Sequence, residues 1–260
     1  MCRVAAYMGP PRPLEDIIIQ PCHSLLAQSS EALEAKLAVN GDGFGLAWYG
    51  SQNEPGLYRD ILPAWSDGNL LSISRHIESP LFLAHVRAST TGETSRANCH
   101  PFSAGRWSFM HNGQIGHFET IRRTLEAELS DELYNQRVGT TDSELLFLLL
   151  LNAGLNDDPE KACAQAIQKI YSITEAHGLK PFLRLTCVFS NGETLFGFRH
   201  ASDGKDPSLY ASTCFANDAT VLASEPLDGV PENWMSLEPN RLMSFTAGTE
   251  TPPMGTALLQ

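Results

Sequence analysis

Over about the first 112 residues, apolar positions come in short runs that alternate with polar ones, the pattern of half-buried β-strands. The runs read CRVAAY, FGLAWYG, LFLAHVR and RWSFMHN, at residues 2–7, 44–50, 81–87 and 106–112. Stretches rich in Gly, Pro, Asn and Ser separate them and are typical of turns. We therefore expect this part of the chain to be rich in β-strands.

Between about residues 117 and 178 the apolar spacing changes to that of helices. Three segments carry the pattern, at residues 117–129, 142–154 and 158–178. Asp158 and Pro159 are suited to begin the last helix, and Gly178 is suited to end it. The run from Leu145 to Leu151 is far shorter than the roughly 20 apolar residues that a membrane-spanning helix needs, so we expect a buried helix there.

From about residue 182 the strand pattern returns. The segments lie at residues 182–190, 193–200, 208–212, 220–224 and 241–248. Ser190, Asn191 and Gly192 indicate a hairpin turn between the first two. Strands, then helices, then strands predict an α+β architecture in which helices cover antiparallel sheets. No repeat, low-complexity tract or linker interrupts the sequence, so we expect one domain over residues 1–260.

The charge balance argues against several classes of partner. Thirty acidic and eighteen basic side chains give a formal net charge of -12, which repels nucleic-acid backbones and anionic membranes. The N-terminus lacks the apolar segment of a secretory signal, so we expect a cytoplasmic protein. The six cysteines and eight histidines form neither a CxxC pair nor a metal-binding pattern, so we expect no disulfide, metal or cofactor.

The chain begins Met-Cys, and methionine is generally removed before a residue as small as cysteine. Cys2 would then carry both a thiol and a free α-amine. Because an α-amine has a pKa of roughly 7.7 to 8, it can accept the thiol proton near neutral pH. The alternative is that Cys2 is only a small apolar residue of the first strand.

Two further motifs follow predicted strands. In LAHVRASTTG, Arg87 can hold a carboxylate through two parallel hydrogen bonds, or it can pair with a structural acid. In MHNGQI, Asn112 and Gly113 form a dipeptide typical of tight turns. The Asn112 side-chain amide and the Gly113 N–H can also point together at a developing oxyanion.

The motif GTTDSELLFLLLL opens the second predicted helix. Thr141 and Glu144 have the spacing of a capping box, which explains the motif structurally. Asp142 lies in the first helical turn, where it suits the helix dipole, but it can equally pair with a substrate ammonium group.

Taken in order, these motifs resemble one known family. Met-Cys, DGFG, H-x-R-x-S-T, N-x-HPF, HNG, T-D-S-E and ASEPL cover most of the chain. Together they resemble class II glutamine amidotransferase domains. The chain is similar to the standalone branch that includes the γ-glutamyl amidase of ergothioneine biosynthesis and a glutathione-degrading amidase subunit.

The resemblance implies the fold and the catalytic residues. It implies the N-terminal nucleophile hydrolase fold, a four-layer αββα sandwich of two antiparallel sheets between helices. Cys2 is then the nucleophile that attacks a γ-glutamyl carbonyl, and Asn112 and Gly113 form the oxyanion hole. No cofactor or metal is implied.

The resemblance also implies how the substrate is held. Arg87 binds the glutamyl α-carboxylate and Asp142 pairs with the α-ammonium group. Thr90 and His111, in the same two sequence regions, are the other expected substrate contacts. Where many amidotransferases have tryptophan after the arginine, this chain has Ala88.

Three hypotheses follow for the function. In the first, the chain is a self-contained hydrolase of a γ-glutamyl compound, either glutamine or something larger. In the second, it is a glutaminase subunit that supplies ammonia to a separate synthetase chain. In the third, Met1 is retained and the chain is a non-catalytic scaffold. The expected partners are a small-molecule γ-glutamyl substrate and either a synthetase chain or further copies of this chain.

Overall fold

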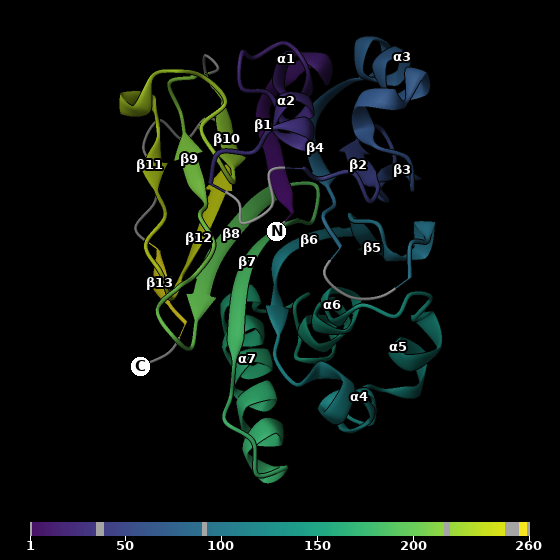
Figure 1. The fold of residues 1–260 in the computed structure, drawn as a ribbon, viewed down its shortest axis with the longest axis vertical. Helices are drawn as coiled ribbons and strands as arrows, with labels where there is room; N and C mark the ends of the chain where they lie inside the picture. The colour runs from purple at the N-terminus through teal and green to yellow at the C-terminus, as the bar shows by residue number, and fades with distance from the viewer. Residues whose placement is uncertain (1, 35–38, 90–92, 216–218, 248–254, 259–260) are drawn as a thin grey trace.

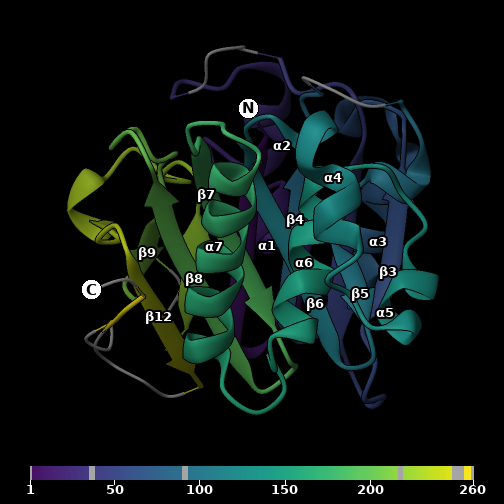
Figure 2. The ribbon, with the colours of Figure 1, turned by 90° about the horizontal axis from the view of Figure 1, so that it is seen from below.

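The computed structural model describes residues 2–34, 39–89, 93–215, 219–247 and 255–258. Within these residues the chain forms two antiparallel β-sheets that pack face to face, with helices on both outer faces (Figures 1 and 2). This arrangement confirms the predicted four-layer αββα sandwich.

The first sheet has seven strands in the described part of the chain, in the order β11-β9-β10-β1-β4-β2-β3. Their bounds are β1 Arg3–Pro13, β2 Phe44–Tyr49, β3 Gly56–Asp60, β4 Glu78–Val86, β9 Tyr210–Ser212, β10 Thr220–Ala223 and β11 Met235–Ser236. The first strand of the chain therefore lies in the middle of the sheet, between β4 and β10. Figure 1 shows the N-terminus near the centre of the view for this reason.

The second sheet has six strands among the described residues, in the order β13-β12-β8-β7-β6-β5. Their bounds are β5 Phe102–Ala104, β6 Trp107–Ile115, β7 Leu183–Ser190, β8 Thr194–Ala201, β12 Arg241–Thr246 and β13 Thr256–Ala257. The predicted hairpin between β7 and β8 is confirmed, with Gly192 at φ +87° and the Asn191 side chain accepting the N–H of Thr194 at 2.9 Å. Strand β6 packs against both β1 and β4 of the first sheet.

Helices cover the two outer faces. Their bounds are α1 Glu15–Ile18, α2 Leu25–Ser30, α3 Gly68–His76, α4 Phe118–Glu126, α5 Asp131–Gln136, α6 Asp142–Asn152 and α7 Pro159–Ala176, with short 3-10 turns at Ala64–Ser66, Arg96–Asn98 and Pro231–Asn233. Helices α1, α2 and α3 contact the first sheet, and α6 contacts β6 (Figure 2). Within the described residues no helix has the length and apolar character needed to cross a bilayer.

Alternation along the strands separates the core into layers. In β1, Val4 and Ala6 point toward the second sheet, whereas Ala5 and Tyr7 pack beneath the helices of the first sheet. A third apolar cluster joins the second sheet to α4, α6 and α7. Because successive strand residues face opposite sides, a central strand buried on both faces must be apolar at almost every position, as β1 is.

The three predicted helices are confirmed as α4, α6 and α7. The expected cap of α7 is present, since the Asp158 side chain accepts the Lys161 N–H at 3.0 Å and Pro159 follows it. The expectation of a strand-rich first part was incomplete, because it omitted α1, α2 and α3. Helices α1 and α2 have four and six residues, too few to show a helical period in the sequence.

Candidate active site

The Cys2 thiol lies at the start of central strand β1, beside the end of β4. Arg3 pairs with Val86 in the register, and the Cys2 Sγ donates to the Ala88 carbonyl oxygen at 3.6 Å. Burial raises the pKa of the Cys2 thiol, while the hydrogen bond to Ala88 and the positive charge of Arg87 act in the opposite direction. The thiol is therefore protonated near neutral pH and needs a base to become a nucleophile. Met1 lies outside the described residues.

The Arg87 guanidinium is buried next to this thiol, with 4% of the residue exposed. Nη1 donates to the Asp42 carbonyl oxygen at 3.3 Å, and Nη2 donates to Ser89 Oγ at 3.1 Å. No carboxylate of the described segments forms an ion pair with it, so a structural acid does not account for this residue. A guanidinium held by neutral acceptors keeps its capacity for an anionic ligand.

The backbone around Asp42 holds the arginine in place. The Asp42 N–H donates to the Arg87 carbonyl at 3.0 Å, and the Arg87 N–H donates to the Gly43 carbonyl at 2.8 Å. Gly43 has φ +117°, a conformation that favours glycine. The DGFG motif thus forms the loop that continues the ladder of β4 past its end.

Asn112 and Gly113 lie inside strand β6, opposite Thr186 and Leu185 of β7. The expected tight turn at this dipeptide is wrong, because both residues belong to a continuous antiparallel ladder. Met110 faces the first sheet, so Asn112 two residues later points into the same intersheet layer. The Asn112 side chain is buried, and neither its amide nitrogen nor its oxygen has a hydrogen-bond partner among the described residues.

Gly113 cannot be replaced without moving the sheet. It has φ +154°, and a Cβ atom added there would lie 1.8 Å from the Arg184 carbonyl oxygen of the neighbouring strand. The glycine therefore lets the backbone depart from a regular strand beside Asn112. Such a departure can turn an N–H away from the ladder and toward a ligand.

Asp142 is the first residue of α6 and is fastened to the end of β6. Its Oδ2 accepts the Ile115 N–H at 2.8 Å. The predicted cap is confirmed, since Thr141 Oγ1 accepts the Glu144 N–H at 3.2 Å. The Glu144 carboxylate instead accepts the N–H groups of residues 138 and 139, so the reciprocal half of a capping box is replaced by a loop contact.

Of the two remaining predicted contacts, only His111 lies within the described residues, and it stands apart from this group. The His111 ring lies on the helix-facing side of β6, the side of Phe109 and Ile115, and its Nδ1 is 2.9 Å from Ser143 Oγ. It therefore lies on the opposite face of the strand from Asn112. Thr90 lies outside the described residues.

The sequence motifs pointed to no role for Glu225 of the ASEPL motif, yet this residue binds Arg3, the residue that follows Cys2. Its buried carboxylate accepts Arg3 Nη1 at 2.9 Å, His23 Nε2 at 2.8 Å, and the N–H groups of Leu33 at 3.0 Å and Glu34 at 2.9 Å. The sequence feature that could have indicated this role is the position of Glu225 just after an apolar strand. A glutamate that is buried there requires hydrogen-bond or charged partners.

The sequence motifs also pointed to no role for a pair of buried histidines. His85 of the H-x-R motif and His100 of the HPF motif stack with ring centroids 4.2 Å apart. Burial lowers the pKa of His85 to about 3 and lowers that of His100 well below its usual range, so both rings are neutral. No cluster of metal-ligating side chains was found in the described segments, and the pair fills space beside Arg87.

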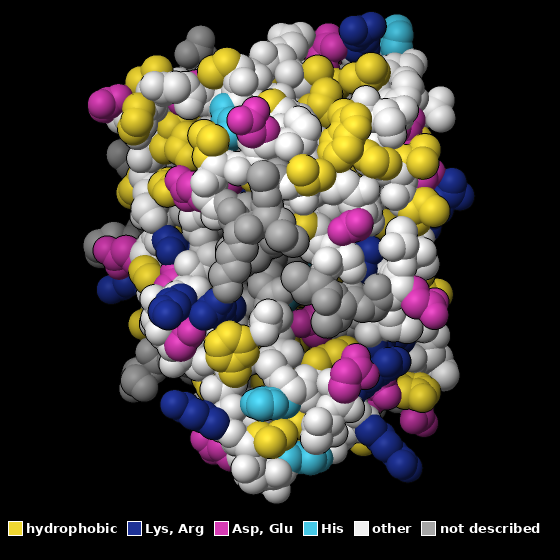
Figure 3. Space-filling model, in the orientation of Figure 1, with side chains coloured by type: hydrophobic (Ala, Val, Ile, Leu, Met, Phe, Trp, Pro, Cys, Tyr) yellow, Lys and Arg dark blue, Asp and Glu magenta, His cyan; other side chains and the backbone are white. Residues whose placement is uncertain are grey.

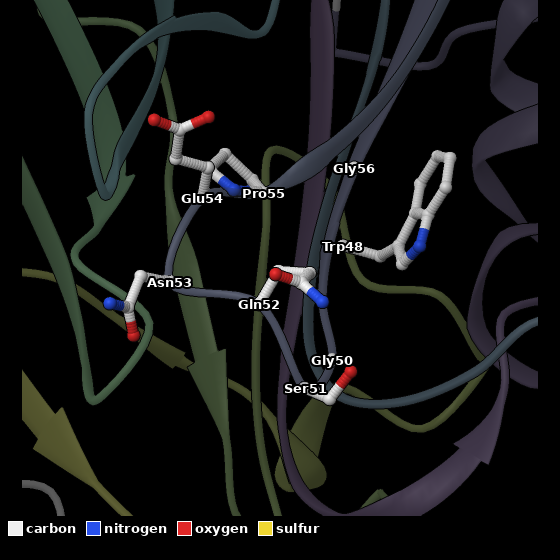
Figure 4. A pocket seen from close by; sticks show the side chains of 8 residues that line it. All are labelled: Trp48, Gly50, Ser51, Gln52, Asn53, Glu54, Pro55 and Gly56. Atoms are coloured by element: carbon white, nitrogen blue, oxygen red, sulfur yellow. The ribbon is translucent and has the colours of Figure 1, made fainter.

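A hollow on the hairpin between β2 and β3 lies apart from these groups. It is lined by Trp48, Gly50, Ser51, Gln52, Asn53, Glu54, Pro55 and Gly56 (Figure 4). It contains none of the predicted site residues, and its open lining offers no convergent set of catalytic groups.

The elements of the site come from both sheets. Cys2 directly precedes β1 and Arg87 directly follows β4, whereas Asn112 and Gly113 lie in β6 and Asp142 begins α6, and β6 packs on both β1 and β4. An αββα sandwich of two antiparallel sheets, with Cys2 directly before its central strand, has the layout of the N-terminal nucleophile hydrolases. Residues 15–211 match the family model described as glutamine amidotransferases class-II. The chain belongs to the class II glutamine amidotransferase family, which confirms the resemblance seen in the motifs.

Two relatives match nearly the whole chain. The chain is 33% identical to a Saccharomyces cerevisiae protein named probable glutamine amidotransferase DUG3, over 96% of this chain and 83% of that protein. It is 29% identical to the gamma-glutamyl-hercynylcysteine sulfoxide hydrolase of Mycolicibacterium smegmatis, over 94% and 95% of the two chains.

Two solved structures share the fold. A glutamine aminotransferase class-II domain protein from Silicibacter pomeroyi has a TM-score of 0.77 and 40% identity, over 99% of both chains. The glutamine phosphoribosylpyrophosphate amidotransferase of Bacillus subtilis has a TM-score of 0.68 over 99% of this chain and 49% of its own, and at 16% identity it shows the fold alone.

Proposed function

We propose that this chain hydrolyses the γ-glutamyl amide bond of a small molecule through a Cys2 thioester. The observation that carries the proposal is the buried Arg87 guanidinium, which lies beside the Cys2 thiol and has no carboxylate partner among the described residues. An α-carboxylate at Arg87 and an α-ammonium group at Asp142 would hold a free glutamyl end between two opposite charges.

The chemistry needs no added cofactor. Removal of Met1 frees the Cys2 α-amine, which accepts the thiol proton. The sulfur then attacks the γ-carbonyl carbon, and the resulting oxyanion is stabilised by the Asn112 amide and the Gly113 N–H. Collapse breaks the C–N bond as the ammonium group of Cys2 protonates the leaving nitrogen. Water, activated by the same amine, hydrolyses the thioester and releases glutamate.

A substrate larger than glutamine is favoured by one relative. The Mycolicibacterium smegmatis protein, named gamma-glutamyl-hercynylcysteine sulfoxide hydrolase, aligns with 94% of this chain. We propose the same class of substrate here, cleaved in the cytoplasm by the chain alone, with neither nucleic acid nor membrane as a partner. The specificity would then be set on the leaving-group side of the scissile bond.

The test combines a measurement of the intact mass of the protein with a comparison of its hydrolysis rates for different substrates. The purified protein should lack the mass of one methionine and should release glutamate from γ-glutamyl dipeptides or thiol conjugates faster than from glutamine. Cys2→Ala should abolish release without lowering the thermal midpoint, and Cys22→Ala, at an exposed thiol, should leave the rate unchanged. Retention of Met1 together with full activity would refute the mechanism. A clear preference for glutamine would instead support a glutaminase that serves a synthetase partner.

A further inference from the structure

We propose that His111 and Ser143 are positioning residues, a hydrogen-bonded pair that fixes the Asp142 carboxylate for the substrate ammonium group. The proposal rests on the function proposed above, because it concerns how the free amino end of a γ-glutamyl substrate is recognised. It also gives His111 a role other than the direct substrate contact expected from the motif.

A continuous chain of hydrogen bonds carries the proposal. His111 Nδ1 lies 2.9 Å from Ser143 Oγ, and Ser143 Oγ lies 3.3 Å from Asp142 Oδ1. The other oxygen of Asp142 accepts the Ile115 N–H at 2.8 Å. Both carboxylate oxygens are thus anchored to strand β6, one directly and one through two side chains.

The direction of these hydrogen bonds follows from the donor inventory. An ionised carboxylate only accepts, so the single Ser143 proton points to Asp142. Ser143 Oγ must then accept from His111, which places the ring proton on Nδ1. Burial lowers the pKa of His111, while the charge of Asp142 and a hydrogen bond with the Arg184 backbone act in the opposite direction, and the net lowering favours a neutral ring.

The position of the pair excludes direct chemistry. His111 and Ser143 are buried, with 1% and 6% of each residue exposed, between β6 and α6. Asn112 points from the opposite face of the same strand into the intersheet layer. His111 is therefore bonded along the chain to Asn112, a proposed oxyanion donor. Its side chain is hydrogen-bonded through Ser143 to Asp142, the proposed acceptor of the substrate ammonium group.

The experiment measures binding, so that it does not depend on turnover. In a Cys2→Ala background, calorimetry gives the dissociation constants of L-glutamate and of glutarate, which differ only in the ammonium group. We expect the parent to prefer glutamate by about tenfold or more, as for a hydrogen-bonded charged pair. Ser143→Ala and His111→Leu should reduce this preference by about fivefold to tenfold while leaving glutarate affinity within about twofold.

Matched variants separate positioning from folding. His111→Asn keeps a donor near the Nδ1 position and should restore most of the preference. Ser108→Ala removes another buried hydroxyl of β6, which hydrogen-bonds to Tyr49 at 2.8 Å, and should leave the preference unchanged at a similar thermal midpoint. If Asp142→Asn loses the preference but Ser143→Ala and His111→Leu keep it, the positioning role is refuted. If the parent itself shows no preference, the assignment of Asp142 to the ammonium group in the proposed function fails.

Discussion

At the residue scale, the charge of Arg87 that we propose for substrate binding has a cost to folding. Its guanidinium is buried and bound to neutral oxygens, so its desolvation is only partly offset in the free protein. A carboxylate ligand would supply the missing opposite charge. Residues of this kind are typical of sites where function is favoured over stability.

We expect Arg87→Gln to separate these two effects. The free energy of unfolding in urea at pH 7 should rise by about 1 kcal/mol, because a buried charge is removed. The KM for a γ-glutamyl dipeptide should rise by about 10-fold to 100-fold, because a charge-assisted bidentate contact is lost. A fall in stability of similar size would show that Arg87 has a structural role.

Asn112 should affect the chemical step rather than binding. Asn112→Ala removes a donor that acts on the oxyanion as charge develops, so kcat should fall by about 10²-fold to 10³-fold with little change in KM. Steady-state kinetics of γ-glutamyl dipeptide hydrolysis measure both constants. Asn53→Ala, on the exposed β2–β3 hairpin, is the control and should match the parent. A rise in KM without a loss of kcat would argue for a contact in the ground state instead.

At the element scale, β1 and the segments that precede and follow α2 are joined through the Glu225 carboxylate. Burial by itself raises the pKa of Glu225, but hydrogen bonds from His23 and from the N–H groups of Glu34 and Leu33, with the charge of Arg3, leave it below its usual value. Because the folded pKa is depressed, the linked stability is present above the unfolded pKa and is lost as the pH falls through the folded value.

We therefore expect Glu225→Gln to change the pH dependence of stability. At pH 7 the variant should be less stable by about 3 kcal/mol, since Arg3 loses its partner in a buried site. Below about pH 4.3, the usual pKa of glutamate, the parent should lose stability faster, so the difference should narrow. Urea titrations at pH 7 and pH 3.5 measure this, with the exposed Glu54→Gln as control. A difference that is constant with pH would rule out the linkage.

At the scale of the whole molecule, the predicted site residues come from two different sheets. Cys2 and Arg87 flank strands of the first sheet, whereas Asn112, Gly113 and Asp142 belong to the second sheet and its helix, so the proposed site would form where the two sheets meet. On the face shown in Figure 3, basic side chains lie among acidic ones. The net charge of the whole chain is -12, so an anionic group of a ligand would have to be bound by a local positive charge.

Loss of activity should therefore coincide with separation of the layers. Trp48 reports on the first sheet and Trp107 on the second. We expect hydrolysis and tryptophan fluorescence to change in one urea transition with the same midpoint, because the site cannot survive when the sheets part. Activity lost well before the fluorescence change would show that a local segment, rather than the sandwich, limits the site.

Much of this architecture was predictable from the sequence. The period of the apolar positions identified the long strands and α4, α6 and α7, because each element buries a face whose spacing its own geometry dictates. The order of the motifs indicated the family. Local capping chemistry at Thr141 and Asp158 was also predictable, since a cap involves only residues three positions apart.

Only the tertiary structure decided which residues share a face and which lie apart. Asn112 and Gly113 have the local preferences of a turn, but pairing with β7 holds them in a strand. The sequence places His111 beside Asn112, whereas the alternation of β6 sends the two side chains to opposite layers. Glu225 and Arg3 are 222 positions apart and meet only through folding. The conformational preference of a short segment depends on residues that are close in the sequence. Contacts between strands and sheets depend on burial by distant residues, which a short segment cannot supply by itself.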